Sequence, residues 1–172
     1  MTRHEDRQLV LLAGIPATGK TFFGQWLAEH EGFLHVDIEA PGQMQHFGLA
    51  EVWHATFANE DVSRLVAALR ALGPRVLLDW GFPPECLHLV EDLKERGVQL
   101  WWFNAQRGIA REEFIKRGTG HVADFDHQMD EIEMLREDID EAFKPHVLTV
   151  LSADGRRMAP AEIWQQVSSH AA

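Results

Sequence analysis

The chain has 172 residues, enough for one hydrophobic core of ordinary size, so we expect a single domain over residues 1–172. Its 27 acidic residues outnumber the 16 basic ones, and the net charge of −11 disfavours nucleic acid as a bulk partner, because Lys and Arg must neutralise a polyanion. The charged N-terminus, the short apolar run interrupted by Gly14 and Pro16, and the single cysteine, Cys86, predict a cytoplasmic protein without an export signal or membrane anchor.

Five apolar stretches predict the strands of a sheet. Each is short, rich in Val, Leu or aromatic residues, and bounded by Gly or Pro, as is typical of parallel strands buried on both faces. In chain order they are a run that ends at Gly14, then residues 33–38, 75–80, 98–105 and 146–151. Helical patterns fill the gaps between them. This alternation predicts an α/β fold with a parallel sheet and helices on both of its faces.

Three of the predicted helices have clear end signals. One runs from a predicted cap at Asn59 to Gly73, one begins at the prolines 83–84 and ends at Gly97, and one closes the chain. A fourth, over residues 124–143, carries nine carboxylates opposite an apolar stripe. Its acidic face is interpreted first as a solvated surface. Repulsion of misplaced phosphates and docking of a basic partner are the alternatives, and the sequence does not select between them.

The stretch between the first strand and the first helix matches the pattern Gly-x-x-x-x-Gly-Lys-Thr. In this phosphate-binding loop, backbone N–H groups surround the phosphates and the helix N-terminus adds positive charge. Lys20 is expected at the β- and γ-phosphates, and the Thr21 hydroxyl at Mg²⁺. The alternative is a glycine-rich turn without a ligand. The residues expected to hold ATP are Gly14, Ile15, Pro16, Ala17, Thr18, Gly19, Lys20, Thr21 and Phe22.

Two carboxylates follow predicted strands and are candidates for the chemistry. Asp79 ends "RVLLD" and is predicted to bind the metal, with a helix cap or turn as the alternative. Trp80 follows it, where many motor-type ATPases have a Glu that activates water, so transfer to a bound hydroxyl is favoured over hydrolysis. Asp37 ends "FLHVD" and is predicted to act as base for the acceptor hydroxyl, with an N-cap for the helix after Pro41 as the alternative.

An arginine cluster follows the fourth predicted strand. Arg107 and Arg111 are four residues apart on one helix face, and Arg117 stands beside Gly118 and Gly120, so residues 107–122 are expected to form a lid. Arg111 and Arg117 are predicted to stabilise the transferred phosphoryl group. Surface charge is the alternative for each arginine.

The motifs "GIPATGKT", "HVD", "LLDWGF" and "AREEFIKRG" resemble those of small P-loop kinases of the nucleoside-monophosphate-kinase superfamily. Within it, the chain is similar to the branch of zeta-toxin-like, chloramphenicol-phosphotransferase-like and polynucleotide-kinase-like proteins. The resemblance implies a three-layer P-loop NTPase fold with strand order 2-3-1-4-5, ATP with Mg²⁺, an acceptor-side Asp37, and lid arginines at Arg111 and Arg117. It also implies that the loop after the last strand, residues 152–156, borders the adenine chiefly through its main chain, with Ser152, Asp154 and Gly155 among its residues.

These observations favour a kinase that transfers the γ-phosphoryl group of ATP to a hydroxyl of a small molecule. A nucleotide-binding regulatory module without such transfer is the alternative, and a nucleic-acid end kinase is the least favoured reading. The acceptor is expected between the segments that follow the second and third strands. Three histidines, at positions 35, 46 and 54, lack a recognisable metal-ligand spacing. The aromatic and histidine side chains that line the acceptor site or pack in the core are Trp53, His54, Phe57, Trp80 and Phe82.

Overall fold

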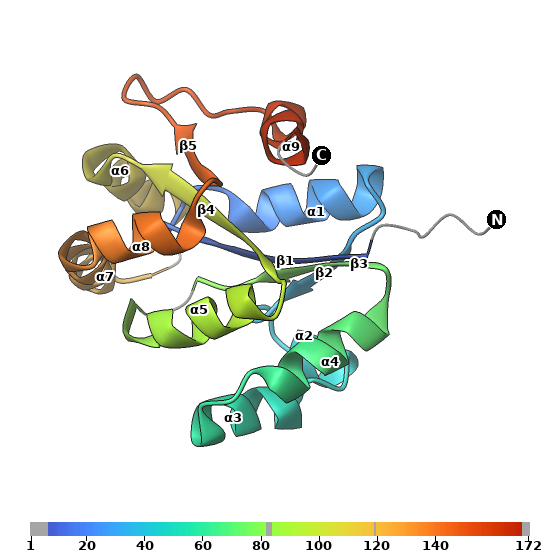
Figure 1. Cartoon of the computed structure of the whole chain (residues 1–172). Helices are drawn as coiled ribbons and strands as arrows, with labels where there is room; N and C mark the ends of the chain where they lie inside the picture. The colour runs from blue at the N-terminus through green and yellow to red at the C-terminus, as the bar shows by residue number, and fades with distance from the viewer. Residues whose placement is uncertain (1–6, 82–83, 119, 170–172) are drawn as a thin grey trace.

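Five strands form one all-parallel sheet in the order β2-β3-β1-β4-β5, so the predicted order is confirmed (Figure 1). The computed structural model describes residues 7–81, 84–118 and 120–169. Each strand end lies within one residue of its predicted position where a range was predicted. The strands are β1 Gln8–Gly14, β2 Leu34–Asp37, β3 Arg75–Asp79, β4 Gln99–Ala105 and β5 Val147–Leu151.

Alternate residues of the strands face two separate cores. In β1, Leu9 and Leu11 belong to one buried cluster, whereas Val10 and Leu12 belong to the other. This alternation follows from the period of two in a β-strand, and burial of both sets explains why the strand sequence is continuously apolar. The sheet is therefore the middle of three layers.

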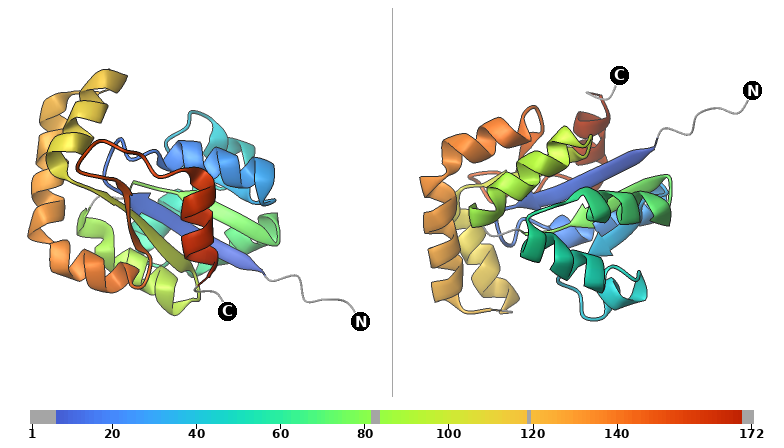
Figure 2. Two further views of the ribbon diagram at one scale, coloured as in Figure 1. Left: turned by 90° about the horizontal axis from the view of Figure 1, so that it is seen from above. Right: turned by 60° about the horizontal axis from the view of Figure 1, so that its bottom comes forward.

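Helices cover both faces of the sheet, as Figures 1 and 2 show. One face packs against α1 and α9, and the other packs against α3, α4, α5 and α8. Helices α6 and α7 lie beyond the carboxyl ends of the central strands. The helices are α1 Lys20–His30, α2 Gln43–His46, α3 Ala50–Asn59, α4 Ser63–Leu72, η1 Pro84–Cys86 (a 3₁₀ turn), α5 Leu87–Glu95, α6 Arg107–Arg117, α7 Val122–Met134, α8 Arg136–Phe143 and α9 Pro160–Ser168.

Two predicted helix boundaries are wrong. Asn59 does not cap α4. It is the last residue of α3, whereas the N-cap of α4 is Val62, and the Ser63 N–H donates to Asp61 Oδ1 at 2.9 Å. The chain reverses between the two helices at Glu60, whose φ of +50° ends α3. The predicted acidic helix over 124–143 is two helices, α7 and α8, separated at Leu135. Its apolar residues Phe125, Met129, Ile132, Ile139 and Phe143 are nevertheless all buried.

The fold places the carboxyl ends of β1, β2 and β3 side by side. Asp37 of β2 pairs in register with Asp79 of β3, and Leu12 of β1 pairs with Asp79 in turn. The loop after β1 therefore begins beside both carboxylates. Among the described helices, none is both long enough and apolar enough to cross a membrane.

Candidate active site

The phosphate-binding loop is shaped by two glycines at its ends. Gly14 has a φ of +147°, and a Cβ atom there would lie 2.4 Å from the carbonyl oxygen of Phe103 in β4. Gly19 has a φ of +91° and is the N-cap of α1. Both conformations favour glycine, which has no Cβ atom to clash. The loop therefore curls between β1 and α1 as the sequence pattern predicts.

Lys20 is folded back onto the loop that it follows. Its Nζ donates to the carbonyl oxygens of Gly14 and Ile15, both at 3.1 Å, and Thr18 Oγ1 donates to the Ile15 carbonyl at 2.7 Å. Burial lowers the pKa of Lys20, while attraction to Asp79 and Glu39 opposes that shift. An anion in the loop would favour the charged ammonium, because it adds negative charge to a buried cation.

Four side chains of types that bind metal ions lie close together where α1, β2 and β3 meet. The Thr21 hydroxyl donates to Asp79 Oδ2 at 3.1 Å and lies 3.5 Å from Asp37 Oδ2. His35 Nε2 lies 3.2 Å from the same Asp79 oxygen. Ligand atoms of His35, Asp37 and Asp79 all lie within 4.8 Å of one another. His35 thus joins a candidate metal site although the spacing of the histidines in the sequence does not indicate one, because its partners lie on other elements.

The donor set fits a divalent cation. Carboxylate and hydroxyl oxygens are the ligands that Mg²⁺ prefers, and Asp37 and Asp79 are both buried. The side chain of Asp79 also lines the cavity beside the phosphate loop. A cation held by Thr21 and Asp79 would therefore stand next to bound phosphates and neutralise part of their charge.

A cavity of about 590 Å³ opens beside the loop. It contains the predicted residues Gly14, Pro16, Ala17, Gly19, Lys20, Thr21, Phe22, Asp79 and Arg117. Its other lining residues, which the sequence analysis did not identify as site residues, are Glu39, Gly81, Phe114, Gln128 and Arg157. The predicted site residues that do not line it are Ile15, Thr18, Asp37, Arg111, Ser152, Asp154 and Gly155.

Asp37 is not among the residues that line the cavity, and it forms a turn at the end of β2. Its Oδ1 accepts the Glu39 N–H at 2.9 Å, and its own N–H donates to Gln43 Oε1 at 2.9 Å. Helix α2 begins with Gly42 as its N-cap, so Asp37 is not the cap that the alternative reading describes. The carboxylate is adjacent to the Thr21 hydroxyl rather than among the cavity-lining groups.

Glu39 is the carboxylate that faces the cavity on this side. A Cβ atom at Gly81 would lie 3.4 Å from its Oε1, so the segments after β2 and β3 meet here. Partial desolvation raises the pKa of Glu39, the Lys20 ammonium opposes that shift, and the carboxylates of Asp37 and Asp79 reinforce it. Glu39 could have been identified as a site residue from its position two residues after Asp37, since a carboxylate there follows the end of the same strand.

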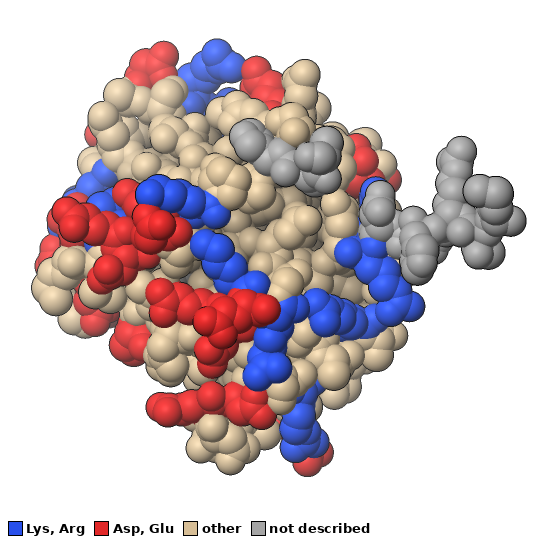
Figure 3. Space-filling view, in the orientation of Figure 1, with Lys and Arg blue, Asp and Glu red and all other residues tan. Residues whose placement is uncertain are grey.

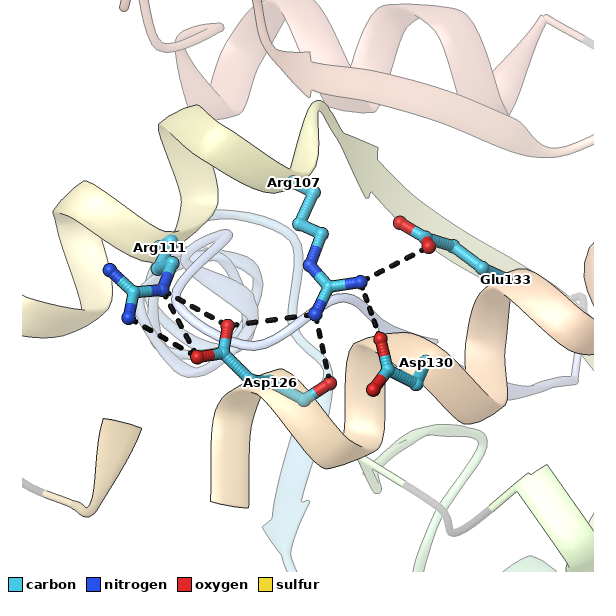
Figure 4. A network of polar contacts seen from close by, with 5 residues as sticks. All are labelled: Arg107, Arg111, Asp126, Asp130 and Glu133. Carbon is cyan, nitrogen blue, oxygen red and sulfur yellow. Dashed lines mark hydrogen bonds and ion pairs between the residues drawn. The ribbon is translucent and has the colours of Figure 1, made fainter. Parts of the chain in front are cut away.

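Arg107 and Arg111 contact the acidic helix α7 (Figure 4). Arg111 makes a two-pronged contact with Asp126, from Nε to Oδ1 at 3.0 Å and from Nη2 to Oδ2 at 3.2 Å. Arg107 donates to Asp130 at 2.6 Å and to Glu133 at 3.1 Å. Acidic side chains gather over α7 and α8 on the left of Figure 3, and part of this surface thus serves to bind the two arginines.

Arg117 lines the cavity at the end of α6, so it differs from the other two arginines. Its positive charge adds to the lowering of the Lys20 pKa, which burial mainly causes, and opposes the rise in the Glu39 pKa. Two cationic side chains thus line the cavity, Lys20 from the phosphate loop and Arg117 from α6, the helix after β4.

The loop after β5 reaches the phosphate loop through Arg157. Its Nη1 donates to the Thr18 carbonyl at 2.6 Å, and its Nη2 donates to the Ala17 carbonyl at 3.3 Å. The predicted residues of this loop, Ser152, Asp154 and Gly155, form the tight turn that precedes it, in which the Gly155 N–H donates to the Ser152 carbonyl at 2.9 Å. The predicted segment stops one residue before the side chain that contacts the phosphate loop.

The aromatic candidates for the acceptor site pack against one another. The ring of Trp80 lies 5.0 Å from that of Trp53 and 5.8 Å from that of Phe57, measured between centroids. Trp80 is 5% exposed. These rings attach α3 to the end of β3, and none of the three lines the described part of the cavity. His54 is exposed, and Phe82 lies outside the described residues.

Sheet order and phosphate loop together give the chain the three-layer fold of P-loop NTPases. Solved structures with this fold are similar over nearly the whole chain. Shikimate kinase from Bacteroides thetaiotaomicron matches with a TM-score of 0.58 at 14% identity, over 95% of this chain and 98% of that one. A gluconokinase from Sinorhizobium meliloti 1021 matches with a TM-score of 0.53 at 14% identity, over 95% and 91% of the two chains. The tunicamycin resistance protein of Deinococcus radiodurans matches with a TM-score of 0.56 at 15% identity, over 95% of each.

Sequence comparison adds no closer relationship. No protein-family profile matches this chain, and a comparison with curated protein sequences gives no significant match. The structural similarity therefore establishes the fold alone.

Proposed function

We propose that this protein is an ATP-dependent kinase that transfers the γ-phosphoryl group of ATP to a hydroxyl of a small molecule. The observation that carries the proposal is that the phosphate loop, Asp79, Glu39 and Arg117 all line one cavity. A regulatory nucleotide-binding module requires the loop, but it does not require an acidic group and a lid arginine in the same cavity. Two of the similar structures are named as kinases.

The residues of the loop are assigned to the nucleotide. The backbone N–H groups of residues 14–21 bind the phosphates, and Lys20 leaves its loop carbonyls to neutralise the β- and γ-phosphates. Thr21 and Asp79 hold Mg²⁺, which when bound supplies charge neutralisation at the phosphates. Arg117 contributes positive charge from the lid side of the cavity.

Two carboxylates are assigned to the acceptor. In the transfer, the acceptor oxygen forms a bond to the γ-phosphorus, the bond between that phosphorus and the ADP oxygen breaks, and the hydroxyl proton passes to a carboxylate. Asp37 is the base proposed from the sequence. Glu39 lines the cavity and orients the acceptor from the same strand end. A carboxylate used in this way contributes about 10²–10⁴ in rate.

A transfer screen from labelled ATP tests the function. The wild-type protein is incubated with ATP, Mg²⁺ and single members of a library of sugars, amino alcohols, nucleosides and antibiotics, and labelled products are separated from ATP and free phosphate. We expect a labelled organic product with the wild type and none with Lys20→Ala. Lys116→Ala, which removes an exposed lysine on α6, is the matched control. Release of free phosphate without a labelled product from any acceptor would contradict the kinase assignment.

A further inference from the structure

The ring of His35 is tightly packed beside the candidate cation site. Its side chain is 8% exposed, and its Nε2 lies 3.2 Å from Asp79 Oδ2. The same end of the ring also faces α1, where a Cβ atom at Gly24 would lie only 2.4 Å from Nε2. The missing side chain of Gly24 therefore leaves the space that the ring occupies. A donor confined in this way loses little conformational freedom when it binds a metal.

The ligand atoms of Thr21, Asp79 and His35 already have spacings that suit one cation. Neighbouring ligands at about 2.1 Å from an octahedral cation lie about 3.0 Å from each other. The Thr21 hydroxyl and the His35 nitrogen lie 3.1 Å and 3.2 Å from Asp79 Oδ2. Small movements would bring these atoms around a shared ion.

The nitrogen changes the chemistry of the donor set. Mg²⁺ prefers oxygen ligands, whereas imidazole suits first-row transition metals, whose affinities for nitrogen donors exceed that of Mg²⁺. A site with the His35 imidazole, the Asp79 carboxylate and the Thr21 hydroxyl has the mixed nitrogen and oxygen donors that Mn²⁺ and Co²⁺ accept. Asp79 and Asp37 keep the site anionic, so a divalent charge is still required.

We propose that His35 is a direct ligand of the cation that serves the nucleotide, and that this site prefers Mn²⁺ or Co²⁺ to Mg²⁺. The inference rests on the proposed function for the presence of a nucleotide beside the site. It concerns the identity of the metal and adds a protein nitrogen to the ligands, whereas the proposed function requires only Thr21 and Asp79.

Pulsed electron paramagnetic resonance on Mn²⁺ tests the ligand directly. The protein is uniformly labelled with ¹⁵N and mixed with Mn²⁺ and an unlabelled, non-hydrolysable ATP analogue, so that a coupled ¹⁵N nucleus comes from the protein. We expect a directly coupled ¹⁵N in the wild type, its loss in His35→Gln, and its retention in His127→Gln, which alters a histidine on α7 with a 76% exposed side chain. Absence of the coupling in wild type would overturn the proposal.

Metal affinities provide a second measurement. Calorimetric titration of the protein and ATP analogue with each metal should give tighter binding of Mn²⁺ than of Mg²⁺. In His35→Gln, Mn²⁺ affinity should fall by at least about tenfold, while Mg²⁺ affinity should change little, because the Gln side chain offers an oxygen. Equal losses for both metals would show that His35 only orients Asp79, and would also overturn the proposal.

Folding and turnover separate the possible failures. Thermal unfolding of His35→Gln, together with analogue binding measured without divalent metal, shows whether the variant retains its site. If it does not retain the site, His35→Asn provides the same ligand test with a shorter side chain. A ¹⁵N coupling in a protein that phosphorylates no acceptor would overturn the kinase function, but it would still support His35 as a ligand of the cation.

Discussion

Replacement of Gly24 by alanine should destabilise the protein only while the ring of His35 is present. Gly24 is buried inside α1, and its added Cβ would lie 2.4 Å from His35 Nε2 and 2.6 Å from Cδ2. Real Cβ atoms do not approach other atoms so closely, so the ring must move. Since that ring is 8% exposed and bonded to Asp79, the movement disturbs a packed and hydrogen-bonded position.

The expected magnitude is the balance of two opposing effects. Overpacking of a tight site costs about 1–3 kcal/mol, whereas alanine in a helix interior is more favourable than glycine by about 1 kcal/mol. Gly24→Ala should therefore lower the free energy of unfolding by up to about 2 kcal/mol. In a chain of this length 1 kcal/mol corresponds to about 2–4 °C in melting temperature. In the His35→Ala background the clash is absent, and the same change should stabilise the protein by about 1 kcal/mol.

A double-mutant cycle measures this change of sign. Wild type, Gly24→Ala, His35→Ala and the double variant are unfolded in urea, and the free energies of unfolding are compared. A coupling of about 1–3 kcal/mol between the two positions is expected. Additive effects, with Gly24→Ala acting equally in both backgrounds, would refute the close packing of the ring against α1.

Four further outcomes are expected. Gly14→Ala should destabilise the fold by more than about 2 kcal/mol in urea titrations, because its Cβ meets the backbone of Phe103 at 2.4 Å, and an unchanged midpoint would contradict this close contact. Burial lowers the pKa of Lys20, so ATP affinity should fall as the pH rises through that lowered value, with proton uptake on binding in calorimetry in two buffers; pH-independent affinity would count against it. The hydrogen bond from Arg111 lowers the pKa of Asp126, so this pair should stabilise the protein at neutral pH and lose that effect as the pH falls through the lowered pKa; acid unfolding of Asp126→Asn, with Asp124→Asn as control, should show a smaller loss than wild type. Arg117→Ala should lower kcat more than ATP affinity, whereas Arg111→Ala, whose side chain is paired with Asp126, should have the smaller effect on kcat, and equal kinetic losses would show that both arginines reach the phosphates.

The phosphate loop was predictable because its residues are consecutive. Gly14, Gly19, Lys20 and Thr21 occupy fixed positions between one strand and one helix, so local sequence specifies both the turn and the groups it presents. The strand pattern was equally local, since the burial of both faces makes each strand continuously apolar. Strand order followed from the resemblance, and pairing of β2 with β3 confirms it.

The sequence by itself determined the α/β class, the strands and the phosphate loop, because these depend on neighbouring residues and a short repeat. Only the tertiary structure decided which side chains share the cavity. Pairing of β2 with β3 places His35 opposite Leu77, from where its side chain reaches Asp79. Packing of α6 on α7 pairs Arg111 with Asp126, while Arg117 lines the cavity. Such contacts join residues that are far apart in the chain, so they depend on how elements pack and not on local spacing. For the same physical reason the contact of Arg157 with the phosphate loop could not be read from the sequence.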